Sequence, residues 1–281
     1  LEERKPPWYN LYPVEPYKFN QDFFSQSSVR GEIYALAVAE KGSWLAIGVT
    51  HLESGVFEIE KWSLDGAYLG TFEGAENYVN AVQIFNGDTK VAGASADGAV
   101  RIWNADTFEL LEVYEHKETF VIRNFSLDED SEKIFAVGSL PHVVEWDMSA
   151  PERVRTFGAH TGWIYAADFD REAVVLLVGG TDGLLSVWDV RENACLYSLP
   201  ARDTAIMSVT SVGGGSCAVG GEDGSIRILE LGIDGKESRG EEVRGKEAPG
   251  KEVLVLRGHE DAVLDLFYQE EGGILLSCGK D

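Results

Sequence analysis

Histidine is the residue type in this chain that could support acid–base catalysis or metal binding near neutral pH. The 281 residues include five histidines, and three of them share a local pattern. His116, His160 and His259 are each followed by an apolar residue four positions later and by an aromatic residue nine positions later. Because the pattern recurs, we expect these three to hold one structural position rather than to catalyse a reaction. His51 and His142 lie outside the pattern and are expected to be exposed in turns, without partners.

Other signatures of catalysis do not occur. The sequence has no GxSxG, HExxH, Walker A or GxGxxG motif in a strand–turn–helix setting. We therefore predict a protein that is not an enzyme, with no catalytic, cofactor-binding or metal-binding residues and no cofactor. Cys195, Cys217 and Cys278 have no CxxC spacing, so we expect small buried residues in a reducing compartment.

The charge of the chain disfavours two classes of partner. There are 48 Asp and Glu against 24 Lys and Arg, which gives a formal net charge of −24. Such a field repels nucleic-acid backbones and anionic membrane surfaces, so we expect neither as a direct partner. No run of about 18 apolar residues is present, and the first residues lack the order of a secretory signal. These features predict an intracellular protein, either cytoplasmic or nuclear.

The elements that must position these residues follow a repeat of about 42 residues. Its first marker is a large apolar residue that recurs at intervals of 41, 43, 42 and 41 residues. The marker residues are Trp62, Trp103, Trp146, Trp188 and Leu229. In three repeats an Asp-Gly pair begins six residues before the marker, at Asp97, Asp182 and Asp223. Short apolar runs that end in glycine lie between the markers and have the length of β-strands.

This pattern resembles the WD40-repeat β-propeller family over residues 29 to 281. Trp-Asp itself occurs at Trp146 and Trp188, whereas the other markers are followed by different residues. The resemblance implies an all-β propeller with about six repeats visible here and seven blades in the full protein. The repeats begin near residues 29, 75, 116, 160, 202 and 259, and we expect the last blade to be incomplete.

Two segments fall outside the repeats. Residues 1–28 are expected to form an extended N-terminal arm, which includes a possible closing strand for the ring and could alternatively bind a partner. Residues 232–252 contain many charged residues and no apolar pattern, which predicts a loop inserted in the fifth repeat. The loop is either a tolerated insertion or a docking or modification site.

The resemblance also implies a hydrogen-bonded set in each blade. The set comprises a histidine before the first strand, a hydroxyl on the second strand, an aspartate in the following turn and a tryptophan on the third strand. In this chain the sets are incomplete, since Gly180 stands in place of the hydroxyl in the fourth repeat and Ala75 in place of the histidine in the second. The structural repeat residues that we assign are His116, His160, His259, Ser95, Asp97, Asp182, Asp223, Trp62, Trp103, Trp146 and Trp188.

Partner binding in this family occurs on the face formed by the loops before the first strands and the turns after the second strands. Trp163 and Tyr78 hold the same repeat position on that face, one residue before the first strand's first buried residue. Both residue types are enriched among the residues that dominate binding energy. Further candidates on the face are Arg202, Lys117, Glu260 and Asp261. Its acidic residues favour partners with basic segments, although an acidic rim is also an ordinary solvated surface.

Arg123 is exceptional because other repeats carry an inward-facing apolar residue at its position. A buried guanidinium without a partner would be strongly destabilising. One interpretation is a one-residue β-bulge that turns Ile122 inward instead. The other is an arginine that faces the central channel and binds an acidic group of a ligand.

We interpret the chain as a scaffold or adaptor that presents blade loops to partner proteins or peptides in a multiprotein complex. One alternative is the substrate-recognition subunit of a ubiquitin ligase, which would need a cluster of arginines on the binding face for phosphorylated peptides. Of the arginines, Arg202 alone falls clearly in such a loop. The second alternative is a propeller enzyme, for which the sequence shows no constellation of reactive residues.

Overall fold

The computed structural model describes residues 32–51, 53–158, 160–233, 250–269 and 272–281. These residues form six antiparallel sheets, which we name blade one to blade six in chain order. Blades one to five have four strands each, and blade six has two among the described residues. The described residues include no helix that is long and apolar enough to cross a membrane.

The strands follow one another as meanders, so that neighbours in sequence are neighbours in the sheet. Blade one contains β1 (Glu32–Val38), β2 (Trp44–His51), β3 (Val56–Ser63) and β4 (Tyr68–Ala75). Blade two contains β5 (Val79–Phe85), β6 (Lys90–Ser95), β7 (Ala99–Asn104) and β8 (Leu110–Glu115). Blade three contains β9 (Ile122–Asp128), β10 (Lys133–Gly138), β11 (Val143–Asp147) and β12 (Ala150–Phe157).

The remaining blades continue the same order. Blade four contains β13 (Ile164–Asp170), β14 (Val175–Gly180), β15 (Leu184–Asp189) and β16 (Ala194–Pro200). Blade five contains β17 (Ile206–Gly213), β18 (Ser216–Gly221), β19 (Ser225–Glu230) and β20 (Lys251–Arg257). Blade six contains β21 (Val263–Gln269) and β22 (Ile274–Gly279).

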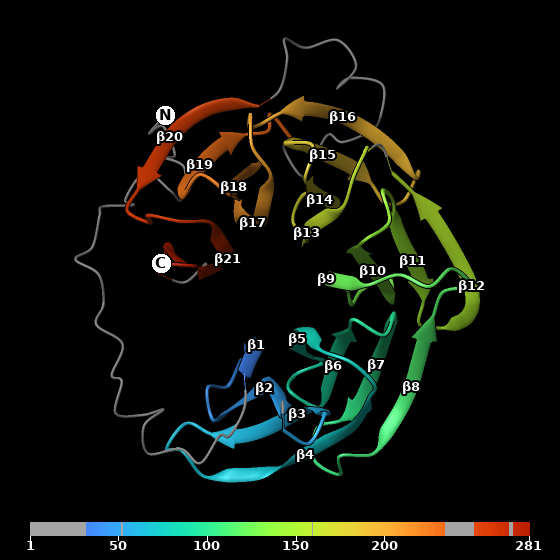
Figure 1. Cartoon of the computed structure of the whole chain (residues 1–281). Coiled ribbons are helices and arrows are strands. Elements are labelled where there is room, and N and C mark those ends of the chain that lie inside the picture. The colour runs from blue at the N-terminus through green and yellow to red at the C-terminus, as the bar shows by residue number, and fades with distance from the viewer. Residues whose placement is uncertain (1–31, 52, 159, 234–249, 270–271) are drawn as a thin grey trace, which may run out of the picture.

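The blades stand side by side around a centre, and Figure 1 shows the first strand of each blade innermost and the fourth outermost. Each first strand contacts the first strand of the next blade, from β1 through to β21. The prediction of an all-β propeller is therefore confirmed. Between β21 and β1 the described residues leave the ring open (Figure 1). Seven blades in the full protein remains a prediction.

Strand composition follows from position in the ring. The second strands, such as β10 and β14, are almost continuously apolar and buried because a neighbouring blade covers each of their faces. The outermost strands, such as β12, are exposed along most of their length. Trp103 and Trp146 are among the largest fully buried side chains and fill the layers between blades. The apolar core thus consists of successive layers between sheets.

Polar side chains join the innermost strands of successive blades. The Asn80 side-chain amide donates to the backbone carbonyl of Ile122 at 2.7 Å, and Ser126 Oγ accepts from the Phe169 backbone amide at 3.0 Å. The separations in sequence are 42 and 43 residues, which is one repeat. The first strand is the inner edge of its sheet, so the backbone groups that point away from the second strand have no strand partner. Side chains of the preceding blade satisfy some of these groups and connect the blades.

Every first strand contains an irregularity at the same place. The register shifts by one residue near the start of each of the six strands, which marks a β-bulge. The bulged residues are Tyr34, Asn80, Arg123, Tyr165, Met207 and Leu264. All six are at least partly exposed.

The structure tests the bulge interpretation of Arg123 directly. Ile122 pairs with Gly138 and is fully buried, while Arg123 leaves the ladder and is exposed. A Cβ on Gly138 would lie 1.9 Å from the carbonyl oxygen of Val121, so only glycine fits opposite this bulge. The bulge is therefore confirmed, and the binding of an acidic group of a ligand by Arg123 stays a prediction.

The predicted boundaries need one correction, and other predictions lie outside the described residues. Strand β20 begins at Lys251, and Ile233 is buried, so the predicted loop 232–252 is too long at both ends. The reason is that Lys251 and Glu252 already pair with β19. The arm 1–28, its closing strand and most of the charged loop lie outside the described residues.

Candidate functional site

Blade four contains a complete hydrogen-bonded set. His160 Nδ1 lies 3.0 Å from Asp182 Oδ1, and His160 Nε2 lies 2.8 Å from Ser186 Oγ. The Trp188 indole donates to the same hydroxyl at 3.0 Å. Both ring nitrogens of a buried histidine are therefore satisfied, which supports a structural role for it.

The hydroxyl of this set does not lie on the strand where it was expected. Ser186 is on the third strand, β15, two residues before the tryptophan, whereas the sequence pattern placed the hydroxyl at Gly180 on the second strand. A Cβ at Gly180 would lie 2.9 Å from His160 Nδ1. Glycine thus leaves room for the imidazole, and the hydroxyl comes from the neighbouring strand.

Blades three and six hold the other two repeat histidines. In blade six, His259 lies 2.8 Å from Asp281 Oδ1 and 2.9 Å from Ser277 Oγ, and here the hydroxyl is on the second strand. In blade three, His116 Nδ1 accepts from the Glu118 backbone amide at 3.2 Å, and the Trp146 indole donates to a backbone carbonyl instead. Each of the three histidines has a partner, and the serine hydroxyls that contact His160 and His259 belong to the same repeated sets.

In blade two the turn aspartate has hydrogen-bond partners although the repeat contains no histidine. Asp97 accepts from the Arg101 guanidinium at 2.8 Å and from the backbone amides of Glu76 and Ala99. Ser95 Oγ donates to the Asn77 carbonyl, and the indole of Trp103 donates to the Glu73 carbonyl at 2.9 Å. An arginine two residues before the tryptophan therefore balances the charge of the turn aspartate.

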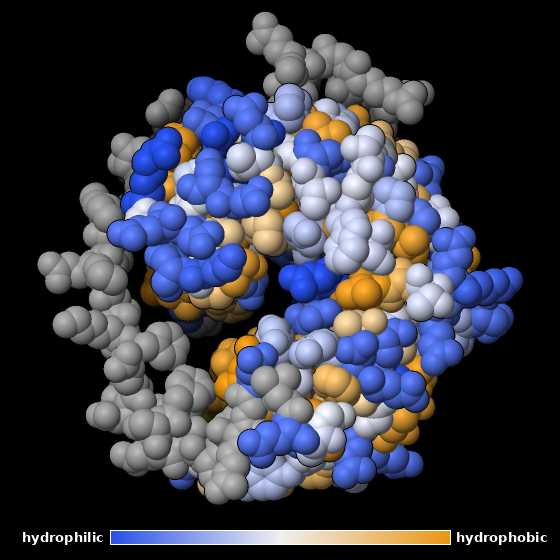
Figure 2. All heavy atoms as spheres, viewed as in Figure 1, coloured by the Kyte–Doolittle hydropathy of each residue, from blue (hydrophilic) through white to orange (hydrophobic). Residues whose placement is uncertain are grey.

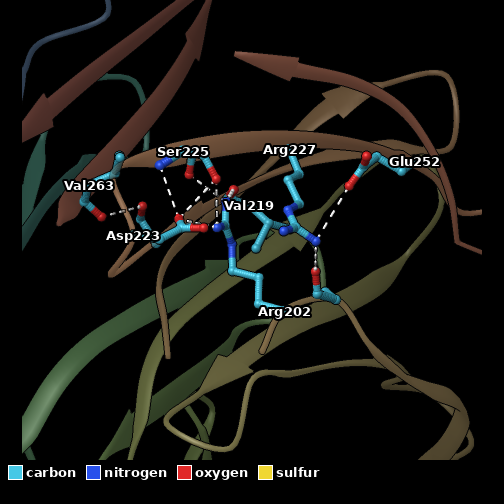
Figure 3. Close-up of polar contacts among 9 residues, drawn as sticks. Arg202, Val219, Asp223, Ser225, Arg227, Glu252 and Val263 are labelled. Atoms are coloured by element: carbon cyan, nitrogen blue, oxygen red, sulfur yellow. Dashed lines mark hydrogen bonds and ion pairs between the residues drawn. The ribbon is translucent and has the colours of Figure 1, made fainter. Parts of the chain in front are cut away.

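Blade five uses an arginine in the place of the histidine, and Figure 3 shows its contacts. Arg202 Nη1 lies 2.5 Å from Asp223 Oδ1 and 3.0 Å from Ser225 Oγ, and Nη2 donates to the Val219 carbonyl at 2.8 Å. Its side chain is 0 % exposed. A Cβ at Gly221 would lie 2.2 Å from Nη1, so glycine again leaves the space that the large side chain needs.

The expectation that Arg202 lies in an accessible loop is therefore wrong. The backbone of Arg202 does follow β16, but its guanidinium points into the blade because Asp223 and the end of β18 offer acceptors there. Burial lowers the pKa of Arg202, and the charge of Asp223 opposes this shift. The pKa of Asp223 is lowered, because the hydrogen bonds from Ser225 and the charge of Arg202 outweigh the effect of its partial burial.

Blade one brings together a histidine and two glutamates. His51 Nε2 lies 2.9 Å from Glu58 Oε1 and 3.7 Å from Glu60 Oε1, and the Trp62 indole donates to Glu60 Oε2 at 2.7 Å. Burial raises the pKa of Glu60. The three ligand atoms lie within 4.8 Å of one another, so they could hold a metal ion, but hydrogen bonds within the blade already explain the arrangement. The expectation that His51 is exposed without a partner is wrong, since adjacent strands place it beside Glu58.

The cysteines differ from one another in burial. Cys217 is buried, as expected, whereas Cys195 and Cys278 are exposed. The expectation fails for these two because Cys195 lies on the outermost strand β16 and Cys278 on β22, beside the opening of the ring. His142 is half-buried in the turn before β11.

The remaining candidate residues lie on the face where the first strands begin. Trp163 is 43 % exposed and Tyr78 is 37 % exposed, and both precede the first residue of an innermost strand. Lys117, Glu260 and Asp261 are exposed in equivalent loops. Figure 2 shows strongly hydrophilic side chains at the centre of the ring, near the inner end of β9. Six of the seven candidates are thus accessible, and Arg202 is not.

Sequence reasoning missed the aromatic neighbours of this face. Tyr78 packs against Tyr34 and Phe57, each at a ring-centroid distance of 5.3 Å. Trp163 meets Tyr165 edge-on at 6.3 Å. Tyr34 and Tyr165 are both bulged residues, so comparison of the residue that follows the first apolar residue of each innermost strand would have found them.

Comparison with known proteins agrees with this fold. The family model described as "WD domain, G-beta repeat" matches residues 62–104, 151–189 and 250–281. Target of rapamycin complex subunit LST8-1 of Arabidopsis thaliana is 27% identical over 122 residues, which is 42% of this chain and 39% of that protein. Eukaryotic translation initiation factor 3 subunit I of Pyricularia oryzae is 26% identical over 111 residues, which is 37% of this chain and 32% of that protein.

A third relative has a name from RNA processing. Pre-mRNA-processing factor 17 of Homo sapiens is 24% identical over 135 residues, which is 47% of this chain and 23% of that protein. In all three cases the matched part spans well under half of the relative. The repeated sheets, the Asp-Gly turns and these matches agree on one conclusion: the chain belongs to the WD40-repeat family.

Proposed function

We propose that the protein is a non-enzymatic scaffold subunit that binds partner proteins or peptides on the face where the first strands begin. The observation that carries the proposal is the pair of accessible aromatic residues, Trp163 and Tyr78, at one repeat position on that face. Large aromatic side chains bury much apolar area and lose little conformational entropy on binding. Their partial exposure leaves area that a partner would cover.

Charge on the same face supports a peptide or protein partner. Glu76, Asp203, Glu260 and Asp261 are exposed in the loops before the first strands. They would steer and orient basic segments of a partner. The net charge of −24 argues against direct contact with nucleic acid or anionic membranes.

The names of the relatives support assembly into a hetero-complex in the cytoplasm or nucleus. Two are called subunits, one of the target of rapamycin complex and one of initiation factor 3. The ubiquitin-ligase alternative depended on arginines in the face loops, and the burial of Arg202 removes its one clear candidate. We therefore propose the scaffold function alone.

The test compares partner binding by Trp163→Ala and Tyr78→Ala with binding by the parent. Each variant is expected to lose partners in quantitative affinity purification with mass spectrometry. Neither change creates a cavity in the core, so the melting temperature should stay within about 3 °C of the parent's. Tyr68→Ala is the matched control, because Tyr68 is an exposed aromatic residue on the outermost strand β4. Unchanged partner sets in both face variants, or unfolding of Trp163→Ala, would contradict the proposal.

A further inference from the structure

The six bulged residues surround the centre of the ring at the start of the innermost strands. Five of them are uncharged, and Arg123 is the sixth. Because a bulge turns its residue out of the ladder, the side chain of Arg123 is available on the proposed binding face. Gly138 lies opposite the bulge and permits it, because a Cβ at this position would clash with the carbonyl oxygen of Val121.

Arg123 forms a continuous row with two aromatic residues of blade four. The guanidinium carbon lies 5.6 Å from the centroid of the Tyr165 ring, within the range of a cation–π contact. Tyr165 in turn packs edge-on against Trp163, whose ring is partly exposed. The row therefore presents a positive charge at one end and an apolar surface at the other.

No carboxylate of the described residues lies within 4.0 Å of the Arg123 guanidinium, although the chain has twice as many acidic as basic residues. Other described arginines form ion pairs with acidic residues, for example Arg101, Arg155 and Arg202. Arg153 also lacks an acidic partner, but it lies on the outermost strand β12 and not over an aromatic ring of the described residues. Arg123 therefore combines an unpaired charge with an aromatic setting.

We infer that Arg123, Tyr165 and Trp163 bind a partner segment in which an aspartate or glutamate side chain is followed or preceded by a large apolar residue. The carboxylate would accept from the guanidinium, and the apolar side chain would cover the indole of Trp163. This inference rests on the proposed function and adds the chemistry of the segment bound at Arg123, while the acidic residues of the neighbouring loops would orient basic residues elsewhere in the same partner. A single accessible arginine matches the one charge of a carboxylate better than the two of a phosphate.

The experiment selects ligands without knowledge of the natural partner. A phage-displayed library of random peptides is selected on the 281-residue protein and, in parallel, on Arg123→Gln, Arg123→Glu and the matched control Arg153→Gln. The parent and the control are expected to enrich peptides with Asp or Glu near an aromatic or aliphatic residue. Arg123→Glu is expected to enrich Lys or Arg instead of the acid.

One enriched peptide then serves as the probe in fluorescence anisotropy. Arg123→Gln is expected to raise its Kd by about tenfold or more, because a charge-assisted hydrogen bond is lost. Changing the acid of the peptide to its amide should weaken binding to the parent by a similar factor and should not weaken binding to Arg123→Gln further. Arg153→Gln should leave the Kd unchanged.

Several outcomes would overturn the inference. It fails if the amide peptide binds the parent as well as the acid does, or if a phosphoserine peptide binds more tightly than the aspartate peptide. If binding depends on Trp163 but not on Arg123, the inference fails while the proposed function stands. If no selected peptide depends on Trp163 or Tyr78, or if none is enriched, the proposed function fails as well.

Discussion

Replacement of Arg202 by alanine is expected to lower the free energy of unfolding by about 2–4 kcal/mol, because it removes a buried side chain and leaves buried acceptors without a donor. The guanidinium is fully buried and bonds to Asp223, Ser225 and the Val219 carbonyl. Without it, Asp223 loses its positive partner and the carbonyl of Val219 loses a donor. Urea unfolding followed by tryptophan fluorescence measures the change.

A second substitution at the same position separates charge from packing. Arg202→His should recover part of the loss, since His160 and His259 fill the same space in blades four and six and bond to an aspartate and a serine. Arg153→Ala, on the exposed outermost strand, should change the stability by less than about 0.5 kcal/mol. Equal stability of Arg202→Ala and the parent would show that the buried network contributes nothing.

Ionisation of Asp168 is expected to cost about 2–3 kcal/mol of stability as the pH rises from about 4 to 6. Burial between blades four and five raises the pKa of Asp168 to about 6, against hydrogen bonds from the Ser211 amide and the Thr210 hydroxyl that lower it. The nearby Asp170 carboxylate also raises it. In this pH window the folded protein holds a proton that the unfolded chain has released, so rising pH favours unfolding.

The variant Asp168→Asn removes the ionisation and keeps an acceptor oxygen for the Ser211 amide. Its stability should match the parent near pH 4 and exceed it by about 2–3 kcal/mol near pH 7. The difference between the two urea-unfolding profiles isolates Asp168 from the other titrating groups. Asp130→Asn, at an exposed turn position, is the control and should give no such pH-dependent difference. Parallel profiles for Asp168→Asn and the parent would contradict the assignment.

The repeat length and the turns of this protein could be predicted from its sequence. The spacing of Trp103, Trp146 and Trp188 determined the repeat length and with it the sheets, because a propeller needs the same apolar residue at the same place in every blade. The Asp-Gly turns were recognised for the same reason. Such features depend on local sequence, and the structure places them as the pattern indicated.

The polar sets inside the blades were less predictable. Ser186 on β15 replaces a hydroxyl that was expected at Gly180 on β14, and Arg202 replaces a histidine. Several combinations of residues can satisfy the aspartate of the turn, and which combination is used depends on side chains from different strands and loops of the blade. The repeat pattern assigns each residue type to one position, so it does not predict that a residue at another position takes over the same contact.

The sequence by itself determined the all-β class, the repeat length and the accessible positions of Trp163 and Tyr78, since these follow from apolar periodicity and turn residues within single repeats. Only the tertiary structure decided that the Arg202 guanidinium is buried, that Arg123 stands out on a bulge, and that Tyr165 lies beneath its charge. The physical reason is that these features arise from contacts across strands and between blades about 42 residues apart. A side chain's exposure and partners there depend on the space and the acceptors that its neighbours provide.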